Sequence, residues 1–478
     1  MKAAFTTIIL VLNLWVSAQN YTATNGSSYT GSLNVHNNPA AMVNVPVKWD
    51  LTLFGFQDKH YTNIVDVFKY SLISNPANSE YLVKEGNFKR YGAVNANLNL
   101  LNGRIALNKQ NAIAFGINVR SYTDVKSSVY NYIDTIKRFG EFFGMNEANQ
   151  GMTGSLVNSS WAELYLSYGR TIYENEFLRL NAGLTLKGNR GVAGIFANID
   201  NGRFQRIPAT DPVEYLVTSA ETRWGYSSNL DRWDGNQSTG KNLGSFFSFT
   251  ESGASADIGF ELLLKPVAPE TPETEESYFD YDWKIGLSFL DLGYTQYHFG
   301  KYSTAVASIR PNVTDLRLDR SLDSTTKTLR SFKDSLSSLY QFSGTYEGKY
   351  RINHPARMVV NVDRFVTGSF FVNAELSVDL SKLPIKDNIR VRDINQLTIT
   401  PRWETKRKGF YIPVYVNDRS QFWIGGAVRL GPVLFGVHNL ANIFSQKKIT
   451  RGGGYFAIIL RSRDITGSRG DRRLDCPK

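Results

Sequence analysis

Cysteine is nearly absent, with only Cys476 in a chain of 478 residues, and charged residues make up just 20% of the sequence. A lone cysteine excludes an intramolecular disulfide, and no cysteine is placed to carry a lipid at a mature N-terminus. After the N-terminal twenty residues there is no run of roughly 18 apolar residues, the length that a membrane-spanning helix needs. Stability and any membrane insertion must therefore come from another kind of structure.

Catalytic and metal-binding patterns are also missing. The five histidines are not set in a nucleophile motif, and no Gly-x-Ser-x-Gly, His-Glu-x-x-His, Cys-x-x-Cys or calcium-loop spacing occurs. His438 falls at the end of a predicted strand, where a catalytic triad could assemble in space, but a structural histidine is the better interpretation. We expect no catalytic residue, no metal and no cofactor, and therefore a protein that is not an enzyme.

The net charge of +11 is spread over strands and loops and does not gather with aromatic residues. Nucleic-acid binding needs a basic patch or stripe. We therefore expect no nucleic-acid partner.

The sequence is rich in segments in which apolar residues alternate with small or polar ones. In residues 111–120, Ile113, Phe115, Ile117 and Val119 alternate with small or polar residues. A period of two over about ten residues is typical of a strand with one apolar and one wet face, and about ten residues span a bilayer as a tilted strand. Mean hydropathy stays low at −0.28, as expected when every apolar residue has a polar neighbour.

The same unit recurs along the chain and predicts fourteen strands. They are residues 47–56, 91–107, 112–123, 160–172, 178–189, 253–265, 282–290, 353–365, 369–380, 396–404, 410–416, 421–430, 432–438 and 453–462. The gaps after odd-numbered strands are mostly long and those after even-numbered strands mostly short, with 417–420 and 266–281 as exceptions. Short turns at one end and long loops at the other are typical of outer-membrane barrels. We therefore predict an all-β, antiparallel transmembrane barrel of about fourteen strands.

Four regions follow from this reading. Residues 1–18 have a short basic start, an apolar stretch and a Val-Ser-Ala end, which predicts a signal peptide. Residues 19–46 form an Asn/Ser/Gly-rich segment that lies in the lumen or the periplasm. Residues 47–463 form the barrel, and residues 464–478 form a periplasmic tail. The long loops then face the outside of a bacterial outer membrane.

The segment before the first strand contains Asn38-Pro39-Ala40-Ala41. Here the chain resembles the FadL/PorV-like outer-membrane barrels of the Bacteroidota type, in particular a subgroup of uncharacterised outer-membrane proteins. Residues 287–293 and 436–440 resemble further features of that group. The resemblance implies that Asn38, Pro39 and Ala40 belong to a hatch folded into the lumen. The chain departs from many such barrels because a tail follows the last strand, where an aromatic end is usual.

Alternation also assigns polar side chains to the lumen. A charge facing lipid at mid-depth costs about 2–4 kcal/mol for Arg or Lys, so charged residues on strands should point inward. The lumen-facing candidates are Arg179, Lys187, Asp257, Glu261, Glu375, Arg402 and Arg429. Solvation of the wall is the simpler role for them, and a binding site is the alternative.

Trp and Tyr near strand ends predict interfacial girdles. These are Trp49, Tyr91, Trp161, Tyr173, Trp283, Trp403, Tyr411, Tyr415, Trp423 and Tyr455. Helical patterns in the outer loops predict helices at 132–143 and 324–340, the latter capped by Asp323 or Ser324, and a third around 64–68.

Two functions remain open. The FadL-like resemblance implies a channel or transporter for a hydrophobic or amphipathic small molecule, and the PorV-like resemblance implies a non-transporting scaffold or shuttle of a secretion or gliding apparatus. The expected partners are outer-membrane lipid, a hydrophobic small-molecule ligand and secretion-system proteins. Wall sequence alone does not choose between them, because both functions use the same wall.

Overall fold

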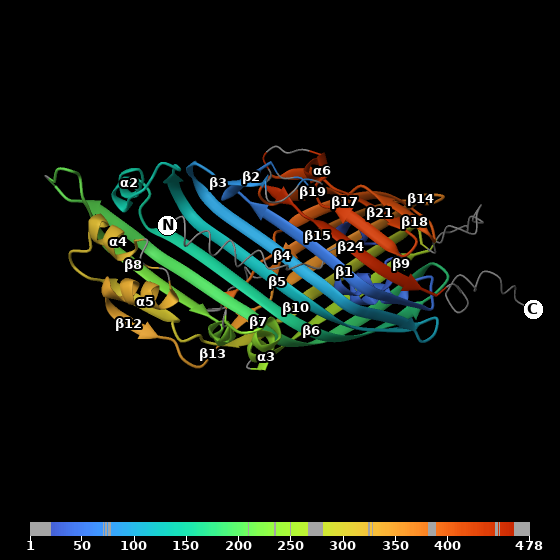
Figure 1. The fold of residues 1–478 in the computed structure, drawn as a ribbon. Helices are drawn as coiled ribbons and strands as arrows, with labels where there is room; N and C mark the ends of the chain where they lie inside the picture. The colour runs from blue at the N-terminus through green and yellow to red at the C-terminus, as the bar shows by residue number, and fades with distance from the viewer. Residues whose placement is uncertain are drawn as a thin grey trace, which may run out of the picture.

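The chain folds into one closed antiparallel β-barrel of 14 strands (Figure 1). The computed structural model describes residues 21–69, 71, 74, 78–208, 210–233, 236–248, 250–265, 281–323, 326, 328–380, 389–444, 448 and 450–462. The predicted signal peptide and tail lie outside these residues, as does most of the predicted loop 266–281. The predicted fold class and strand number are confirmed.

The wall of the barrel consists of fourteen strands, two of which are each divided into two segments, and we call these fourteen strands the staves. In order they are β1 (Trp49–Thr62), β4 (Gly86–Ala106), β5 (Asn111–Tyr132), β6 (Met152–Glu174), β7 (Leu178–Arg206), β9 (Ser252–Leu264), β10 (Trp283–His298), β14 (Arg357–Thr367), β15 (Phe370–Asp379), β17 (Gln396–Glu404), β18 (Lys408–Tyr411) with β19 (Val414–Asn417), β20 (Phe422–Ile424) with β21 (Gly426–Leu430), β22 (Val433–Val437) and β24 (Gly454–Arg461). The barrel closes where β24 pairs with β1, with Gly55 opposite Ala457.

Two staves are interrupted for a local reason. Pro413 separates β18 from β19, and proline has no N–H to give to a ladder. The facing stave breaks at Gly425, whose N–H donates to the Pro413 carbonyl at 2.8 Å. The two breaks therefore lie side by side, and the ladder is restored on both sides of them.

Side chains alternate between two environments along the staves. On β7, Arg179, Thr185 and Lys187 are buried in the interior, whereas Leu184 and Leu186 are 44% and 60% exposed on the outside. An apolar exterior around a polar interior is the arrangement of barrels that span the bacterial outer membrane. The protein is a barrel of this outer-membrane type. None of the described helices is both long and apolar enough to cross a bilayer.

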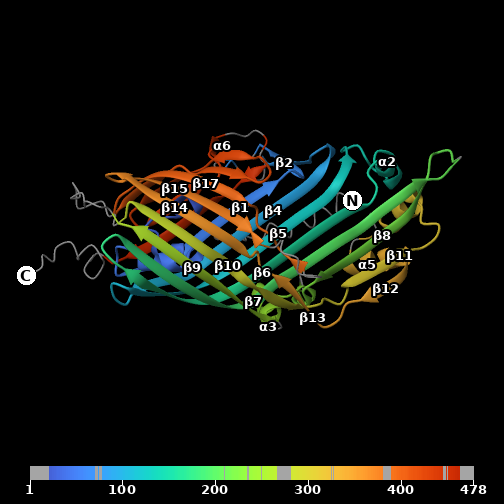
Figure 2. The same ribbon diagram turned by 180° about the vertical axis from the view of Figure 1, so that it is seen from behind.

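Strands β5, β6 and β7 continue beyond the barrel and contribute to a folded outer structure. β7 is 29 residues long, and its far half pairs with β8 (Tyr215–Tyr226), which pairs with β11 (Thr304–Ile309) and then β12 (Tyr340–Thr345). Helices α2 (Phe139–Gly144), α4 (Asp315–Ser321) and α5 (Leu329–Ser338) lie at this same end (Figures 1 and 2). We call the far half of β7 together with β8, β11, β12, α2, α4 and α5 the outer platform. Phe143, Phe204, Trp224 and Leu336 belong to its own apolar core.

The remaining elements are short and lie mostly at the long-loop end. They are β2 (Val65–Phe68), β3 (Glu80–Val83), η5 (Ser228–Arg232), α3 (Thr239–Ser248), β13 (Lys349–Asn353), β16 (Ile389–Arg390), α6 (Ala441–Phe444) and β23 (Arg451–Gly452). β2 and β3 form a separate hairpin, and β16 pairs with β13 in parallel.

The loop predictions were partly wrong. The helix expected at 132–143 is only α2, because residues up to Tyr132 continue β5. The helix expected at 324–340 begins at Leu329, and its cap is Thr328, whose hydroxyl accepts from Ser331 N–H in a capping box. The helix expected around 64–68 is instead strand β2, which pairs with β3.

The girdle prediction was wrong for half of its residues. Trp49, Tyr173 and Trp283 are exposed on the outside, as a girdle requires. In contrast, Trp161, Tyr411, Tyr415, Trp423 and Tyr455 are buried in the interior. Trp161 has the same inward parity as the buried Glu163 and Tyr165, and the other four pack against the N-terminal segment or against each other.

Candidate functional site

The interior of the barrel is filled by the N-terminal segment. Residues 21–47, which we call the plug, form the turns η1 (Thr22–Thr24), η2 (Gly31–His36) and η3 (Pro39–Val43), and nearly all of them are buried. The plug contains no Asp, Glu, Lys or Arg. A segment without charge therefore occupies a lumen whose walls are rich in charge.

The Asn-Pro-Ala sequence begins the last turn of the plug. Asn38 caps η3, because its side-chain oxygen accepts from Ala40 N–H at 2.9 Å. Pro39 occupies the first position of the turn, where its missing N–H costs nothing. Asn38 also donates through Nδ2 to the Phe260 carbonyl on β9 at 2.9 Å. This short sequence therefore both starts the turn and attaches it to the wall.

A row of inward-facing glycines receives this turn. Gly169, Gly183 and Gly259 lie directly opposite one another on β6, β7 and β9, and Gly286 on β10 extends the row. A Cβ at Gly183 would lie 2.4 Å from Pro39 C, and one at Gly259 would lie 2.1 Å from Asn38 Oδ1. Only residues without a side chain allow η3 to approach so closely. We call these four residues the glycine seat.

Wall carboxylates bind the plug through neutral donors. Glu375 accepts from Asn25 Nδ2 at 3.0 Å and from Asn37 Nδ2 at 2.7 Å. Glu404 accepts from Ser27 Oγ at 2.7 Å. Hydrogen bonds to a charged group are stronger than those between neutral groups, so these contacts fix the plug without an ion pair.

Wall cations bind the plug through its carbonyls. Arg104 donates to the Met42 and Val47 carbonyls at 2.7 and 2.9 Å, and Lys284 donates to the Gly26 carbonyl at 2.5 Å. Gly26 has a φ of 80°, a conformation in which glycine is favoured. The backbone of the plug therefore carries much of its attachment.

Most of the charged residues of the wall are paired with one another. Arg120 binds Asp291 through two contacts of 2.5 and 2.7 Å, and Lys187 lies 2.8 Å from both Asp257 and Asp291. Glu163 lies 3.3 Å from Arg120. Together we call these five residues the ionic layer. Removing one member of such a buried network costs roughly 3–5 kcal/mol, because its partner keeps an uncompensated charge.

A second group of pairs lies around β14, β15 and β17. Arg402 binds Asp363 and contacts Glu404 at 2.8 Å, and Arg357 lies 3.1 Å from Asp393. These ion pairs join wall residues to one another, but Arg402 and Glu404 also contact the plug, since Arg402 donates to the Gly26 carbonyl at 3.4 Å and Glu404 accepts from Ser27.

Aromatic side chains form a layer on the outer side of the ionic layer. Tyr122 and Trp161 each lie two residues beyond an ionic-layer residue toward the long loops, and their rings stack at 5.7 Å. Trp161 also stacks on His354 at 4.1 Å. Phe196, Tyr297 and Tyr350 complete this group, which we call the aromatic collar. The outer part of the lumen is therefore lined by rings.

The residues predicted to face the lumen are all buried in the interior. Lys187 and Asp257 belong to the ionic layer, and Glu375 accepts from two asparagines of the plug. Arg402 pairs with Asp363 and donates to the Gly26 carbonyl of the plug. Arg179 contacts Asn44 of the plug and Glu174, and Glu261 accepts from Asn181 at 3.1 Å. Arg429 does not join the network: it donates to the Thr405 and Lys408 carbonyls of a short turn.

Several functional residues were not selected from the sequence. Arg120 shares a face with Asn118 and could have been chosen by alternation. Asp291 could not, because it lies at a bulge of β10 with φ of 59° that breaks the alternation after Phe289. The glycine seat follows the inward parity of its strands, but only pairing across strands shows that its members are neighbours.

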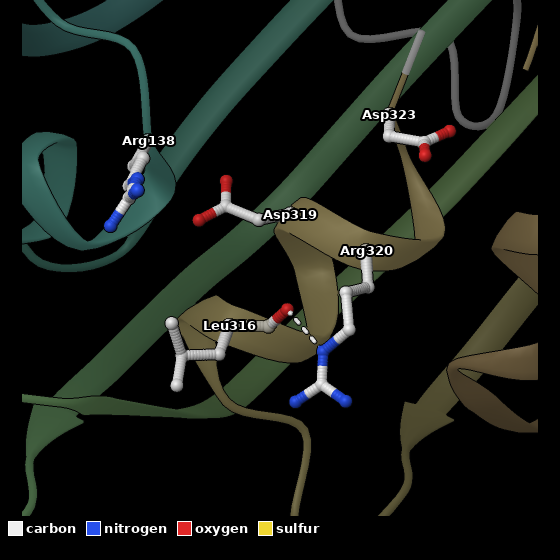
Figure 3. A pocket seen from close by; sticks show the side chains of 5 residues that line it. All are labelled: Arg138, Leu316, Asp319, Arg320 and Asp323. Carbon is white, nitrogen blue, oxygen red and sulfur yellow. Dashed lines mark hydrogen bonds between the residues drawn. The ribbon is translucent and has the colours of Figure 1, made fainter. Parts of the chain in front are cut away.

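A separate hollow of about 470 Å³ lies on the outer platform, between the start of α2 and helix α4 (Figure 3). Arg138, Arg320, Asp319, Asp323 and Leu316 line it. Asp319 accepts from Phe139 N–H at 3.0 Å, so the carboxylate joins α4 to α2. Two arginines and two aspartates balance in charge, and the hollow offers no nucleophile. Among the described residues no group of three or more His, Cys, Asp or Glu is arranged to hold a metal.

A family model described as "Family of unknown function (DUF5723)" matches residues 27–439. The chain belongs to this family. The DUF5723 match begins inside the plug and includes thirteen staves from β1 to β22, so plug and wall fall within one family region. No curated protein matches the chain.

Solved outer-membrane proteins show a weak structural similarity to the DUF5723 chain. The Ralstonia pickettii toluene transporter TbuX is 11% identical, with a TM-score of 0.37, and the match covers 94% of this chain and 99% of TbuX. The P. putida toluene transporter TodX is 10% identical, with a TM-score of 0.33 and coverage of 90% and 93%. A Pseudomonas aeruginosa FadL homologue is 9% identical, with a TM-score of 0.23 and coverage of 93% and 97%.

Proposed function

We propose that this barrel is a channel that carries a hydrophobic or amphipathic small molecule across the outer membrane, and that the plug is its gate. The observation that carries the proposal is the division of charge. The plug has no charged residue, while Arg120, Lys187, Arg357 and Arg402 have carboxylate partners on the wall. When the plug shifts, these ion pairs persist, and water can replace the neutral hydrogen bonds that break.

The aromatic collar supports an apolar or amphipathic cargo. Its rings lie at the outer end of the lumen, where a molecule entering from outside would arrive first. Aromatic faces bind apolar molecules through large contact areas, and the hydroxyls of Tyr122 and Tyr297 are already bonded to Arg120, Ser159 and Ser160 of the wall, which leaves the rings as the binding surface. A water-filled pore for ions or sugars would instead present an open polar mouth.

A disulfide tether between plug and wall tests the gate. Ser32 Oγ on η2 and Thr52 Oγ1 on β1 are 2.9 Å apart, so cysteines at both positions can form a bond with little movement. In a Cys476→Ser background, we expect oxidised Ser32→Cys/Thr52→Cys protein to lose uptake of radiolabelled oleate and toluene in cells lacking the native protein. A reducing agent should restore uptake.

Each single cysteine variant is the matched control, since neither can form the tether. Both should transport equally under oxidising and reducing conditions. If the oxidised double variant transports as well as the single variants, the plug is not the gate. If the unmodified protein restores no uptake of either compound, the transport proposal itself fails.

A second function is supported by the outer platform. Its sheet and three helices have their own apolar core and stand beyond the staves, which is more structure than a pore mouth requires. A scaffold or shuttle of a secretion or gliding apparatus would use this surface. Cross-linking from the platform to a large envelope partner, together with uptake that does not respond to the tether, would favour the scaffold.

A further inference from the structure

Between β8 and β9 the chain makes an excursion along the outside of the barrel that contains η5 and α3. It leaves the wall at Ser227, whose N–H donates to the Gly194 carbonyl at 2.8 Å, and Asn229 Nδ2 donates to the Val192 carbonyl at 2.6 Å. It returns at Thr250, whose hydroxyl accepts from Arg190 Nε at 2.5 Å. Both ends are therefore attached to β7 between residues 190 and 194.

This attachment marks the outer limit of the lipid-facing band. The outward residues of β7 run through Leu184, Leu186 and Gly188 to Arg190, which is the first exposed charge after the leucines. On the neighbouring strand, Leu164 lies opposite Gly188 and is 64% exposed. The change from exposed leucine to exposed arginine places the membrane boundary at the level where α3 is attached.

Helix α3 carries apolar side chains that the protein leaves uncovered. Leu243 and Phe247 are 43% and 45% exposed, and Phe246 lies with them at helical spacing. Trp233 is 50% exposed and meets the Phe246 ring edge-on at 6.5 Å. None of the buried apolar clusters among the described residues includes these four side chains. The one charged residue of α3 is Lys241.

We propose that α3 and Trp233 are embedded in the interface of the outer leaflet, so that this excursion anchors the barrel to lipid. Trp and Phe favour the boundary between headgroup and acyl chain, and an amphipathic helix lies in that plane with its apolar face down. Lys241 and Arg190 lie where the phosphates of headgroups would meet them. The lipid contact of the barrel thereby continues onto α3, and this inference does not depend on transport.

Site-directed spin labelling tests the anchor. Single cysteines replace Leu243, Phe247 or Lys241 in the Cys476→Ser full-length protein, reconstituted in vesicles of phosphatidylethanolamine and phosphatidylglycerol. Leu166→Cys, on the outward face of β6, is the lipid control, and Asp334→Cys, on exposed helix α5, is the water control. Collision rates with oxygen, which concentrates in lipid, and with a water-soluble nickel chelate report the surroundings of each label.

We expect labels at Leu243 and Phe247 to collide more with oxygen than with the nickel chelate, as at Leu166. The label at Lys241 should show the reverse order, as at Asp334. Collision rates at Leu243 and Phe247 that match those at Asp334 would overturn the proposal. Low rates with both reagents would overturn it as well, because they would show protein covering α3. Heat-modifiable migration on gels confirms that each variant is folded.

Discussion

Glycine decides how closely plug and wall can approach. At Gly183 the glycine seat places backbone against backbone, because the nearest atoms are backbone atoms of Pro39 and Ala40, whereas the other three glycines face mainly side chains. The tolerance for a side chain at Gly183 is therefore set by rigid atoms. Overpacking of a site that cannot relax typically costs about 1–3 kcal/mol.

We expect Gly183→Ala to loosen the plug, because its Cβ would lie 2.4 Å from Pro39 C. The variant should show faster protease cleavage within the plug and higher conductance in planar bilayers. Gly188→Ala is the matched control, because it changes the same strand at a position with nothing within 4 Å. Equal cleavage of the two variants would show that the seat does not hold the plug.

At the residue scale, sequence alternation predicts which way a side chain points but not what it meets. Arg179, Lys187 and Arg429 were all assigned to the interior, and all are buried there. Their partners differ because Arg429 reaches a short turn while Lys187 reaches two aspartates on other strands. Pairing of this kind depends on strand register and bulges, which a local pattern does not contain.

Among the elements, three neighbouring strands meet at the rim of the barrel through one carboxylate. Glu251, just before β9, contacts His298 at 2.6 Å on β10 and Lys349 at 2.9 Å on β13. The hydrogen bond from Lys349, with help from the charge of His298, lowers the pKa of Glu251 below its ordinary value of 4.5. A lowered carboxyl pKa stabilises the folded state above that ordinary value, and the contribution is lost as pH falls through the folded pKa.

We therefore expect the thermal midpoint of the native protein to be steady above pH 4.5 and to fall at lower pH. Part of this fall should come from protonation of Glu251 and should be missing in the Glu251→Gln variant. Since the side chains of His298 and Lys349 are 40% and 51% exposed, water screens both ion pairs, and the contribution to stability should be small. The measurement is heat-modifiability against pH in detergent, with Glu221→Gln, a carboxylate on β8, as the control variant. Identical pH profiles for native and Glu251→Gln protein would contradict the prediction.

Strands could be predicted where one face meets lipid and the other the lumen. There the alternation is complete, and all fourteen staves were found. Past the membrane both faces of β5, β6 and β7 meet water or protein, so the alternation fades and does not predict their outer halves as strand. Residues 64–68 show the same limit, since four residues fit a helix turn or a strand equally well.

For the molecule as a whole, a barrel of fourteen strands encloses more space than wall side chains fill, and the plug occupies it. We expect deletion of residues 21–46 to leave a folded barrel, because the wall pairs its own charges. The deletion variant should conduct ions steadily in planar bilayers, while the full chain stays mostly closed. A deletion variant that folds but stays closed would show that the collar or the outer platform, rather than the plug, seals the barrel.

The plug leads directly into β1, which pairs with β4 along one edge and with β24, the last strand of the wall, along the other. The plug is therefore synthesised and exported before the last strand of the wall, and so before the barrel can close. Until β24 pairs with β1, the plug is surrounded by unpaired strands. An apolar plug would then aggregate, and a charged plug would form ion pairs with wall residues before the barrel has closed. The Asn- and Ser-rich, uncharged character of the plug suits such a delay, since it can stay hydrated until the final seam forms around it.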